Sequence, residues 1–282
     1  MKIGVLIPEI SANLPEMLEK MAGIGAEGVQ FYVKNKHYDL TGCTAEELRQ
    51  LKKRIDNLGL ELPAICGELG GHGFQIREEN PQKLATLKHI IDMAEILETP
   101  VVSTHIGVIP DDTESPIFKA VLEAMTEAGI YAKSKGIGIA IETGPETPEV
   151  LKMFLDMTEG GVGANLDPAN LVMVHNVNAA HSAEVLKGHI LHTHAKDGIN
   201  LRKCDAMKVY NAFAEGGFEQ LVAESGELFK EVPLGEGNVN FPEYIPALKK
   251  AGYDGYLTIE REVGAKPFDD IKMAVAFLKN LL

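Results

Sequence analysis

Four side chains with carboxylate or imidazole groups stand at the ends of successive apolar runs in the second half of the chain. In sequence order they are Glu142, Asp167, His194 and Glu260. Such oxygens and nitrogens are ligands of hard to borderline divalent cations such as Mg, Mn, Co and Zn. If the four runs are consecutive parallel strands, their C-terminal ends meet at one face and the side chains converge. The sequence therefore predicts one divalent metal ion held by these four residues.

The bulk composition is that of a globular protein in a reducing compartment. The chain has 282 residues, 45% of them hydrophobic and 24% charged, and one α/β barrel needs about 250. The net charge of -14 argues against a nucleic-acid-binding surface. Cys43, Cys66 and Cys204 cannot all pair and have no CxxC spacing, which favours a cytoplasmic location. No apolar run has the length expected of a secretory signal or a membrane span.

Short apolar runs alternate with helical patterns along the whole chain. A strict alternation of this kind predicts a parallel sheet with helical crossovers, and eight units favour a closed barrel. We therefore expect one α/β domain over 1–282, a single (β/α)8 TIM barrel, with a long irregular loop at about 198–240 after the seventh strand. The eight runs are 3–7, 28–33, 62–67, 100–106, 137–142, 162–167, 189–195 and 256–260.

Helix starts are marked by capping side chains. Asn80, Ser115 and Thr147 each precede a proline, which predicts an N-cap followed by proline at the first helical position. Thr44 followed by Glu47 matches a capping box. These signals place helices between the apolar runs, as the barrel interpretation requires.

Five segments, read together, resemble the xylose-isomerase-like TIM barrel superfamily. They are Ile139–Glu142, Asn165–Asp167, His194–Asp197 with the pattern HxKD, Val232–Gly237 with PLGEG, and Tyr253–Glu262 with IExE. The superfamily holds sugar and sugar-phosphate isomerases and epimerases, inosose dehydratase, hydroxypyruvate isomerase and endonuclease IV. The resemblance covers nearly the whole chain and implies that the same four residues bind the metal. It also implies a sugar as the small-molecule partner and a possible homo-oligomer.

The chemistry that such a site supports is proton transfer next to a carbonyl. A divalent metal can chelate the carbonyl and carbinol oxygens of a sugar and stabilise the enediolate that forms when the neighbouring C–H loses its proton. A carboxylate base must remove the proton and an acid must return it. Resemblance to the tagatose 3-epimerase branch implies that Glu142 and Glu260 are these catalytic groups.

Further polar residues near the strand ends are candidates for substrate contact. His105 ends the fourth run, at a position where members of the superfamily commonly place a pocket histidine. Glu68 and His72 lie on a Gly-rich loop after the third run, which can approach a ligand closely. Lys196 is expected to bind a hydroxyl or, with Asp197, to orient His194. The remaining substrate-binding candidate, for an anionic group, is Arg202.

Two positions are expected to lie near the floor of the same pocket. His192 shares the strand face of His194 and is predicted to be one layer deeper, satisfied by a hydrogen bond. Gln30 and Tyr32, at the end of the second run, are expected to line the pocket floor.

Three alternatives to an isomerase or epimerase remain open. An inosose-type dehydratase on the same scaffold would expel a hydroxyl instead of reprotonating carbon. An endonuclease IV-like enzyme is disfavoured, because Asn170, Phe229 and Glu231 stand where its additional metal ligands are wanted, and the chain is acidic. The last is a catalytically silent barrel used for binding. No nucleic acid or membrane partner is expected.

Overall fold

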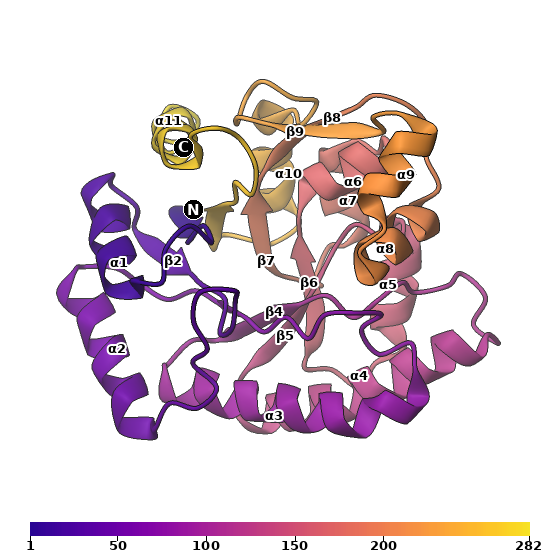
Figure 1. The fold of residues 1–282 in the computed structure, drawn as a ribbon, viewed down its shortest axis with the longest axis horizontal. Coiled ribbons are helices and arrows are strands. Elements are labelled where there is room, and N and C mark those ends of the chain that lie inside the picture. Colours follow the sequence, from indigo (N-terminus) through magenta and orange to yellow (C-terminus); the bar gives the residue numbers. More distant parts are fainter.

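Eight parallel strands form the inner wall of the fold in the computed structural model, which describes residues 1–282 (Figure 1). They are β1 (Lys2–Leu6), β2 (Gly28–Gln30), β3 (Ile65–Cys66), β4 (Val101–Thr104), β5 (Gly138–Glu142), β6 (Val162–Leu166), β7 (Ile190–Ala195) and β10 (Tyr256–Ile259). Their order around the wall is β2-β1-β10-β7-β6-β5-β4-β3. Isolated parallel bridges, Gly28 to Glu61 and Tyr32 to Cys66, join the two edges, so the barrel is nearly closed. The predicted α/β barrel is confirmed.

Helices surround this wall and cover its outer surface (Figure 1). They are α1 (Leu14–Gly23), α2 (Ala45–Asn57), α3 (Asn80–Ile96), α4 (Pro116–Ser134), α5 (Pro148–Met157), α6 (Pro168–His175), α7 (Ala179–Val185), α10 (Phe241–Lys250) and α11 (Pro267–Lys279), with a short 3-10 helix, η1 (Arg77–Glu79), before α3. None of the helices combines the length and the apolar composition that crossing a membrane demands.

Most of the predicted helix caps are confirmed. The Thr44–Glu47 capping box starts α2, Ser115 accepts from the Ile117 N–H, and Thr147 accepts from the Val150 N–H. The prediction for Asn80 is wrong. Its side chain is buried and donates to the carbonyl oxygen of Phe74 at 3.0 Å, so it fixes the preceding loop instead of capping α3.

The apolar core and the barrel interior have different chemistry. A cluster of 64 buried hydrophobic residues forms the main core. Inside the barrel, buried polar side chains meet instead: Gln30 donates to Ser103 Oγ at 2.8 Å, and His192 Nε2 lies 3.2 Å from Gln30 Oε1. The deeper, hydrogen-bonded position predicted for His192 is therefore confirmed. This polar interior continues upward into the mouth of the barrel.

The segment after β7 is folded, contrary to the irregular loop expected there. β8 (Asp197–Asn200) and β9 (Phe229–Val232) form an antiparallel pair, and α8 (Ala206–Glu215) and α9 (Phe218–Ser225) lie between them. We call 197–232 the insertion; it lies at the top and right in Figure 1. Asp205 caps α8, and Gly216 ends it with a φ of 71°. These two local signals mark a helix inside a region whose charges and glycines alone suggested a loop.

Asp197 explains why the HxKD and PLGEG segments occur together. Its buried carboxylate accepts from the backbone N–H groups of Gly198, Gly235, Gly237 and Val239 at 2.9 to 3.0 Å. At Gly237 a Cβ atom would lie 2.1 Å from Asp197 Oδ1, so only glycine permits this approach. Asp197 thus holds the turn after the insertion and does not orient His194.

Asp197→Ala should strongly destabilise the fold. It removes one acceptor from four N–H groups, and each buried group left unpaired costs about 1–3 kcal/mol. We expect a loss of at least about 3 kcal/mol in the free energy of unfolding, measured by urea denaturation. Asp205→Ala, which removes an exposed helix cap, should cost only about 1 kcal/mol. Equal losses in the two variants would contradict the role given to Asp197.

Candidate functional site

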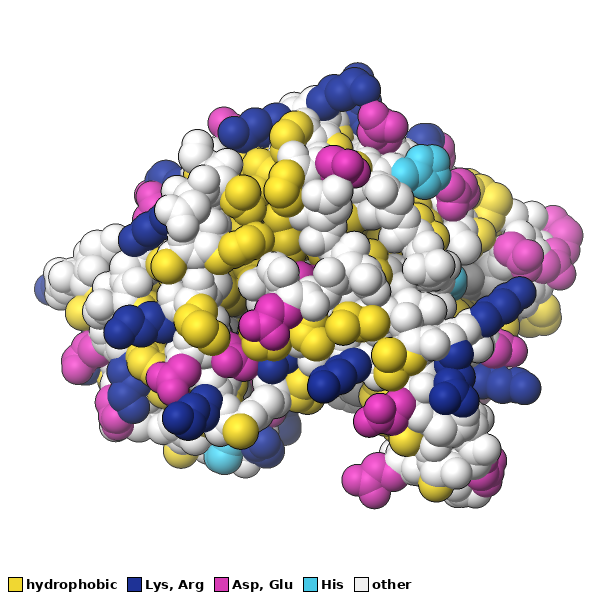
Figure 2. Space-filling view, turned by 90° about the horizontal axis from the view of Figure 1, so that it is seen from above, with side chains coloured by type: hydrophobic (Ala, Val, Ile, Leu, Met, Phe, Trp, Pro, Cys, Tyr) yellow, Lys and Arg dark blue, Asp and Glu magenta, His cyan; other side chains and the backbone are white.

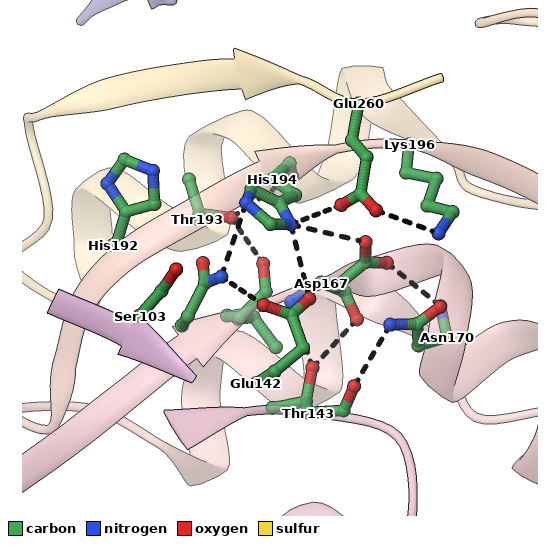
Figure 3. Close-up of polar contacts among 12 residues, drawn as sticks. Ser103, Glu142, Thr143, Asp167, Asn170, His192, Thr193, His194, Lys196 and Glu260 are labelled. Atoms are coloured by element: carbon green, nitrogen blue, oxygen red, sulfur yellow. Dashed lines mark hydrogen bonds and ion pairs between the residues drawn. The ribbon is translucent and has the colours of Figure 1, made fainter. Parts of the chain in front are cut away.

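Glu142, Asp167, His194 and Glu260 converge at the C-terminal mouth of the barrel (Figure 3). Each offers one ligand atom, and these atoms all lie within 4.8 Å of one another. All four side chains are buried. Glu142 and His194 belong to β5 and β7, whereas Asp167 and Glu260 directly follow β6 and β10. Four neighbouring strands therefore bring together the residues that the sequence predicted as metal ligands.

His194 presents a defined nitrogen to this cluster. Its Nδ1 lies 3.1 Å from Glu142 Oε1 and 3.6 Å from Asp167 Oδ2, and it contacts Glu260 Oε2. Its Nε2 lies 3.0 Å from Gln30 Oε1, which can only accept a hydrogen bond. Nε2 also lies 3.3 Å from Asn165 Nδ2. In a neutral ring the shorter contact with Gln30 favours the proton on Nε2, which directs the lone pair of Nδ1 at the three carboxylates, as binding of a cation would require.

The two carboxylate oxygens of Asp167 have different roles: one caps a helix and the other faces the cluster. Oδ1 caps α6 by accepting from the Asn170 N–H at 2.9 Å. The backbone of Asp167 is held by Thr143, whose hydroxyl accepts from its N–H at 2.8 Å and donates to its carbonyl oxygen at 2.9 Å. The other oxygen, Oδ2, is buried without a hydrogen-bond partner. The helix cap fixes the carboxylate so that one oxygen is directed into the cluster.

The cluster has the properties of a cation site. Asp167 Oδ2 and Glu260 Oε2 are buried without hydrogen-bond partners. Burying several carboxylates together is unfavourable unless a positive charge compensates them. Lys196, itself buried, compensates only the outer edge, where its Nζ lies 3.1 Å from Glu260 Oε1. A divalent ion among three carboxylates and one imidazole nitrogen fits this donor set.

The two carboxyl groups predicted to be catalytic have opposite electrostatic surroundings. Burial raises the pKa of Glu142 to about 7, although the neighbouring His194 opposes this. Burial also works against ionisation of Glu260, but the charges of Lys196 and His194 more than offset it and hold its pKa well below the usual value. Before a cation binds, burial therefore favours the protonated form of Glu142, and the ion pair with Lys196 favours the ionised form of Glu260.

Sequence reasoning missed two residues that position this cluster, Asn165 and Thr143. Asn165 is fully buried and donates from Nδ2 to Glu142 Oε2. It precedes Asp167 by two residues, so strand parity could have indicated that both side chains face the same way. Thr143 directly follows the ligand Glu142, but its hydrogen bonds to Asp167 cross from one strand end to another and carry no local sequence signal.

A cavity of about 1050 Å³ extends outward from the cluster. Glu142, His194 and Glu260 lie in its wall. Four of the five predicted substrate-binding residues also line it: Glu68, His72, His105 and Lys196. Tyr32 lines it as well, and Gln30 lies beneath His194. The loops after β2, β3 and β4 therefore face the same space as the candidate metal ligands.

Glu68 and His105 form a charged pair in this wall. Glu68 Oε1 accepts from the backbone N–H and from Nδ1 of His105, both at 2.9 Å. Burial opposes a charge on the imidazole, but the carboxylate beside it outweighs this and raises the pKa of His105 to about 10. His105 thus presents a protonated ring to the cavity at neutral pH.

The structure does not bring Arg202 to the cavity. Its guanidinium donates to the carbonyl oxygen of Ser225 at 2.6 Å, and its side chain is exposed. The arginine therefore connects the two ends of the insertion. The sequence suggested an anion ligand because a lone arginine in an expected active-site loop gives no indication of a partner 23 residues away.

Comparison with known proteins agrees with this architecture. The profile of the family described as xylose isomerase-like TIM barrel matches residues 18–281, and the chain belongs to this family. An uncharacterised protein of Methanocaldococcus jannaschii is 25% identical over 285 residues, covering 93% of this chain and 84% of that protein.

Three solved structures share the fold over nearly the whole chain. A xylose isomerase domain protein from Planctomyces limnophilus has a TM-score of 0.79 at 23% identity, covering 99% of this chain and 96% of that one. D-Psicose 3-epimerase from Clostridium cellulolyticum H10, solved with D-tagatose, has a TM-score of 0.76 at 14% identity, covering 100% and 99%. The probable 3-DHS dehydratase AsbF from Bacillus anthracis has a TM-score of 0.71 at 17% identity, covering 99% of each chain. At these identities the likeness establishes the fold alone.

Chelator-treated protein should bind one divalent ion, and Asp167→Asn should weaken that binding. The substitution replaces one carboxylate oxygen of Asp167 by an NH₂ group and removes the negative charge. We expect the dissociation constant for Mn²⁺ to rise at least about tenfold. Isothermal titration calorimetry gives the stoichiometry and the constant. The exposed Asp205→Asn should bind as the wild type does. Unchanged affinity in Asp167→Asn would remove Asp167 from the ligand set.

A buried carboxyl group outside the metal cluster has no hydrogen-bond partner. Both oxygens of Glu146, in the loop after β5, are buried without a hydrogen bond. Burial raises the pKa of Glu146 to about 8, although the charge of His105 opposes this. The folded protein therefore keeps this proton over a pH range in which the unfolded chain, with its ordinary pKa of about 4.3, has lost it.

Glu146→Gln should therefore change how stability depends on pH. Because the folded state binds the extra proton, the free energy of unfolding falls as pH rises from about 4.3 towards 8. The glutamine variant has no proton to lose at this position. Its free energy of unfolding relative to that of the wild type should therefore increase between pH 5 and pH 9, by an amount on the order of a few kcal/mol. Urea denaturation at both pH values measures it, with exposed Glu149→Gln as control. Parallel pH dependence in wild type and Glu146→Gln would show that Glu146 is ionised when folded.

Proposed function

We propose that this protein is a divalent-metal-dependent isomerase or epimerase of a sugar or sugar phosphate, acting by proton transfer at the carbon next to a carbonyl. The observation that carries the proposal is the cluster of Glu142, Asp167, His194 and Glu260 in the cavity wall. Membership of the xylose isomerase-like family and the fold shared with a psicose 3-epimerase support it. A bound divalent ion would supply stabilisation of the negative charge that develops on the substrate oxygens.

The protein's own carboxyl groups provide the proton transfers. Glu260, which is paired with Lys196, can accept the proton from carbon, and Glu142, on the other side of the cluster, can return it. They come from β10 and β5, which β7 and β6 separate in the sheet order, so they approach the substrate from different sides. Return of the proton to the opposite face of the same carbon gives epimerisation, and return to the neighbouring carbon gives aldose–ketose isomerisation.

A dehydratase is the second candidate, and one observation favours it specifically. The protonated His105 ring faces the cavity from β4, outside the metal cluster. A proton donor at this place could protonate a departing hydroxyl group. The AsbF dehydratase shares the fold. Mass separates the two reactions, because dehydration removes water and isomerisation conserves mass.

An endonuclease-like function has less support from the geometry. The structure contains a single cluster of potential metal ligands. Asn170 is engaged in the fold, where its Nδ2 donates to the Thr143 carbonyl oxygen at 3.1 Å. Glu231 forms an ion pair with Arg261 at 2.8 Å. Neither residue is free to extend the site to further metal ions, so we propose a small-molecule substrate.

Glu142→Gln should abolish solvent proton exchange while leaving the fold intact. Metal-loaded protein is incubated in heavy water with a panel of ketoses, aldoses and inososes, and deuterium next to the carbonyl is measured by mass spectrometry. For a substrate of the wild type, Glu142→Gln should lose at least about 100-fold in exchange rate, the lower range for a general acid–base group. Glu149→Gln should exchange normally. A fully active Glu142→Gln variant would exclude Glu142 as the proton carrier.

A further inference from the structure

The cavity is much larger than the polar site at its end. A volume of about 1050 Å³ is at the upper limit of pockets that hold drug-sized ligands. A single monosaccharide bound at the metal cluster would leave most of this space to solvent. The rest of the cavity therefore needs an explanation beyond the reaction at the strand ends.

Aromatic side chains of the insertion form the far wall. The rings of Phe213 and Phe218 are stacked with centroids 4.1 Å apart, and Phe218 and Phe229 are stacked at 5.7 Å. Tyr210 contacts Phe213 edge-on at 6.1 Å. All four line the cavity. We call them the aromatic wall.

The aromatic wall lies outside the buried core, although Tyr210 and Phe229 pack against it. None of the residues of α9 is buried, and α8 buries only Val209. Phe213 remains 49% exposed. Both helices are nevertheless amphipathic, with Phe213, Phe218 and Val222 directed at the cavity. In Figure 2, hydrophobic side chains gather near the middle of the face while charged side chains spread around its periphery. An apolar surface that the protein itself does not cover is a binding surface.

The wall is held in a fixed place relative to the metal cluster. On one side Glu231 pairs with Arg261, the residue after Glu260, at 2.8 Å. On the other side His72 Nε2 lies 3.4 Å from Glu215 Oε1, at the end of α8. A Cβ atom on Gly144 would lie 1.8 Å from the Tyr210 hydroxyl, so the wall packs directly on the loop after Glu142. These contacts span the mouth of the barrel.

The charge of the cavity decides what kind of extended ligand fits. Seven glutamates line it, against two lysines and one arginine. Lys196, Arg261 and the protonated His105 are already paired with carboxylates, and of the cations in the lining only Lys230 has no ion pair. A phosphate or carboxylate would therefore meet an excess of carboxylates, whereas an uncharged aromatic ring would pack against Phe213, the exposed member of the aromatic wall.

We infer that the aromatic wall is a second subsite, and that the substrate is an uncharged conjugate: a sugar-like head at the metal cluster that carries a planar aromatic group. This inference rests on the proposed function and narrows its substrate class, since it disfavours sugar phosphates. The reaction at the head is unchanged. The wall contributes binding and orientation through a part of the substrate that does not react.

The test compares matched probes in a binding assay that needs no turnover. Mg²⁺-loaded protein is titrated with 6-O-methyl-D-fructose, 6-O-phenyl-D-fructose and fructose 6-phosphate, which all keep a carbonyl beside a carbinol. Binding is followed by saturation-transfer NMR and calorimetry. The phenyl compound should bind about tenfold more tightly than the methyl compound, as expected when a ring leaves water for an apolar wall. Saturation should be strongest on the phenyl protons. Fructose 6-phosphate should bind more weakly than the phenyl compound.

The preference should disappear when the stacked rings are removed. In a Phe213→Ala, Phe218→Ala double variant the phenyl and methyl compounds should bind equally, with the circular dichroism spectrum and Mn²⁺ affinity of the wild type. Met273→Ala, an exposed apolar residue on α11, is the matched control and should keep the preference. Equal binding of the two fructose ethers to the wild type, tighter binding of the phosphate, or no binding of the phenyl compound would each overturn the subsite.

Failure of the subsite and failure of the proposed function are distinguishable. Deuterium exchange without a phenyl preference would leave the proposed reaction standing and refute the subsite. A phenyl preference that the double variant loses, without exchange on any substrate, would support the subsite and count against the proposed reaction.

Discussion

The burial of three carboxylates around one imidazole nitrogen at the mouth of the barrel is the constraint on which the rest of the site depends. Glu142, Asp167 and Glu260 bring ligand oxygens within 4.8 Å of one another, and little of any of the three side chains is exposed to water. Such a concentration is unfavourable without compensating charge. One lysine and one histidine supply only part of it. The fold therefore leaves an excess of buried negative charge at this site, which a divalent cation would neutralise.

The surrounding structure keeps these carboxylates together instead of letting them separate. The Asp167 carboxylate is fixed by its role as a helix cap, and Asn165 and Gln30 hold Glu142 and His194 from the barrel interior. Because these partners are buried, the ligands cannot turn away to solvent. The buried polar side chains inside the barrel thus support the site.

Most of the barrel was predictable from the sequence because its signals are local. Apolar runs bounded by glycine and by capping residues such as Thr44 and Ser115 mark strands and helices without reference to distant contacts. The metal cluster was predictable for a related reason: in a parallel barrel, position at a strand end determines the face. The predicted helix cap at Asn80 is wrong because the residue type and the following proline do not reveal that its side chain is hydrogen-bonded to the carbonyl oxygen of Phe74.

The insertion shows where sequence reasoning reaches its limit. Its helices are short and leave their apolar sides uncovered, so they lack the buried stripe that identifies a core helix. The roles of Arg202 and Asp197 also could not be predicted from the sequence. Both are charged residues near the active face. Arg202 is fixed by the carbonyl oxygen of Ser225, and Asp197 mainly by N–H groups of Gly235, Gly237 and Val239, in and just after the PLGEG turn; these contacts form only in three dimensions.

Anomalous diffraction from crystals grown with Mn²⁺ tests the central claim most directly. We predict one strong anomalous peak within coordination distance, about 2.0–2.3 Å, of His194 Nδ1 and of oxygens from Glu142, Asp167 and Glu260. An ordered barrel with those four side chains in place and no peak among them, or with the only peak elsewhere on the molecule, would contradict the account.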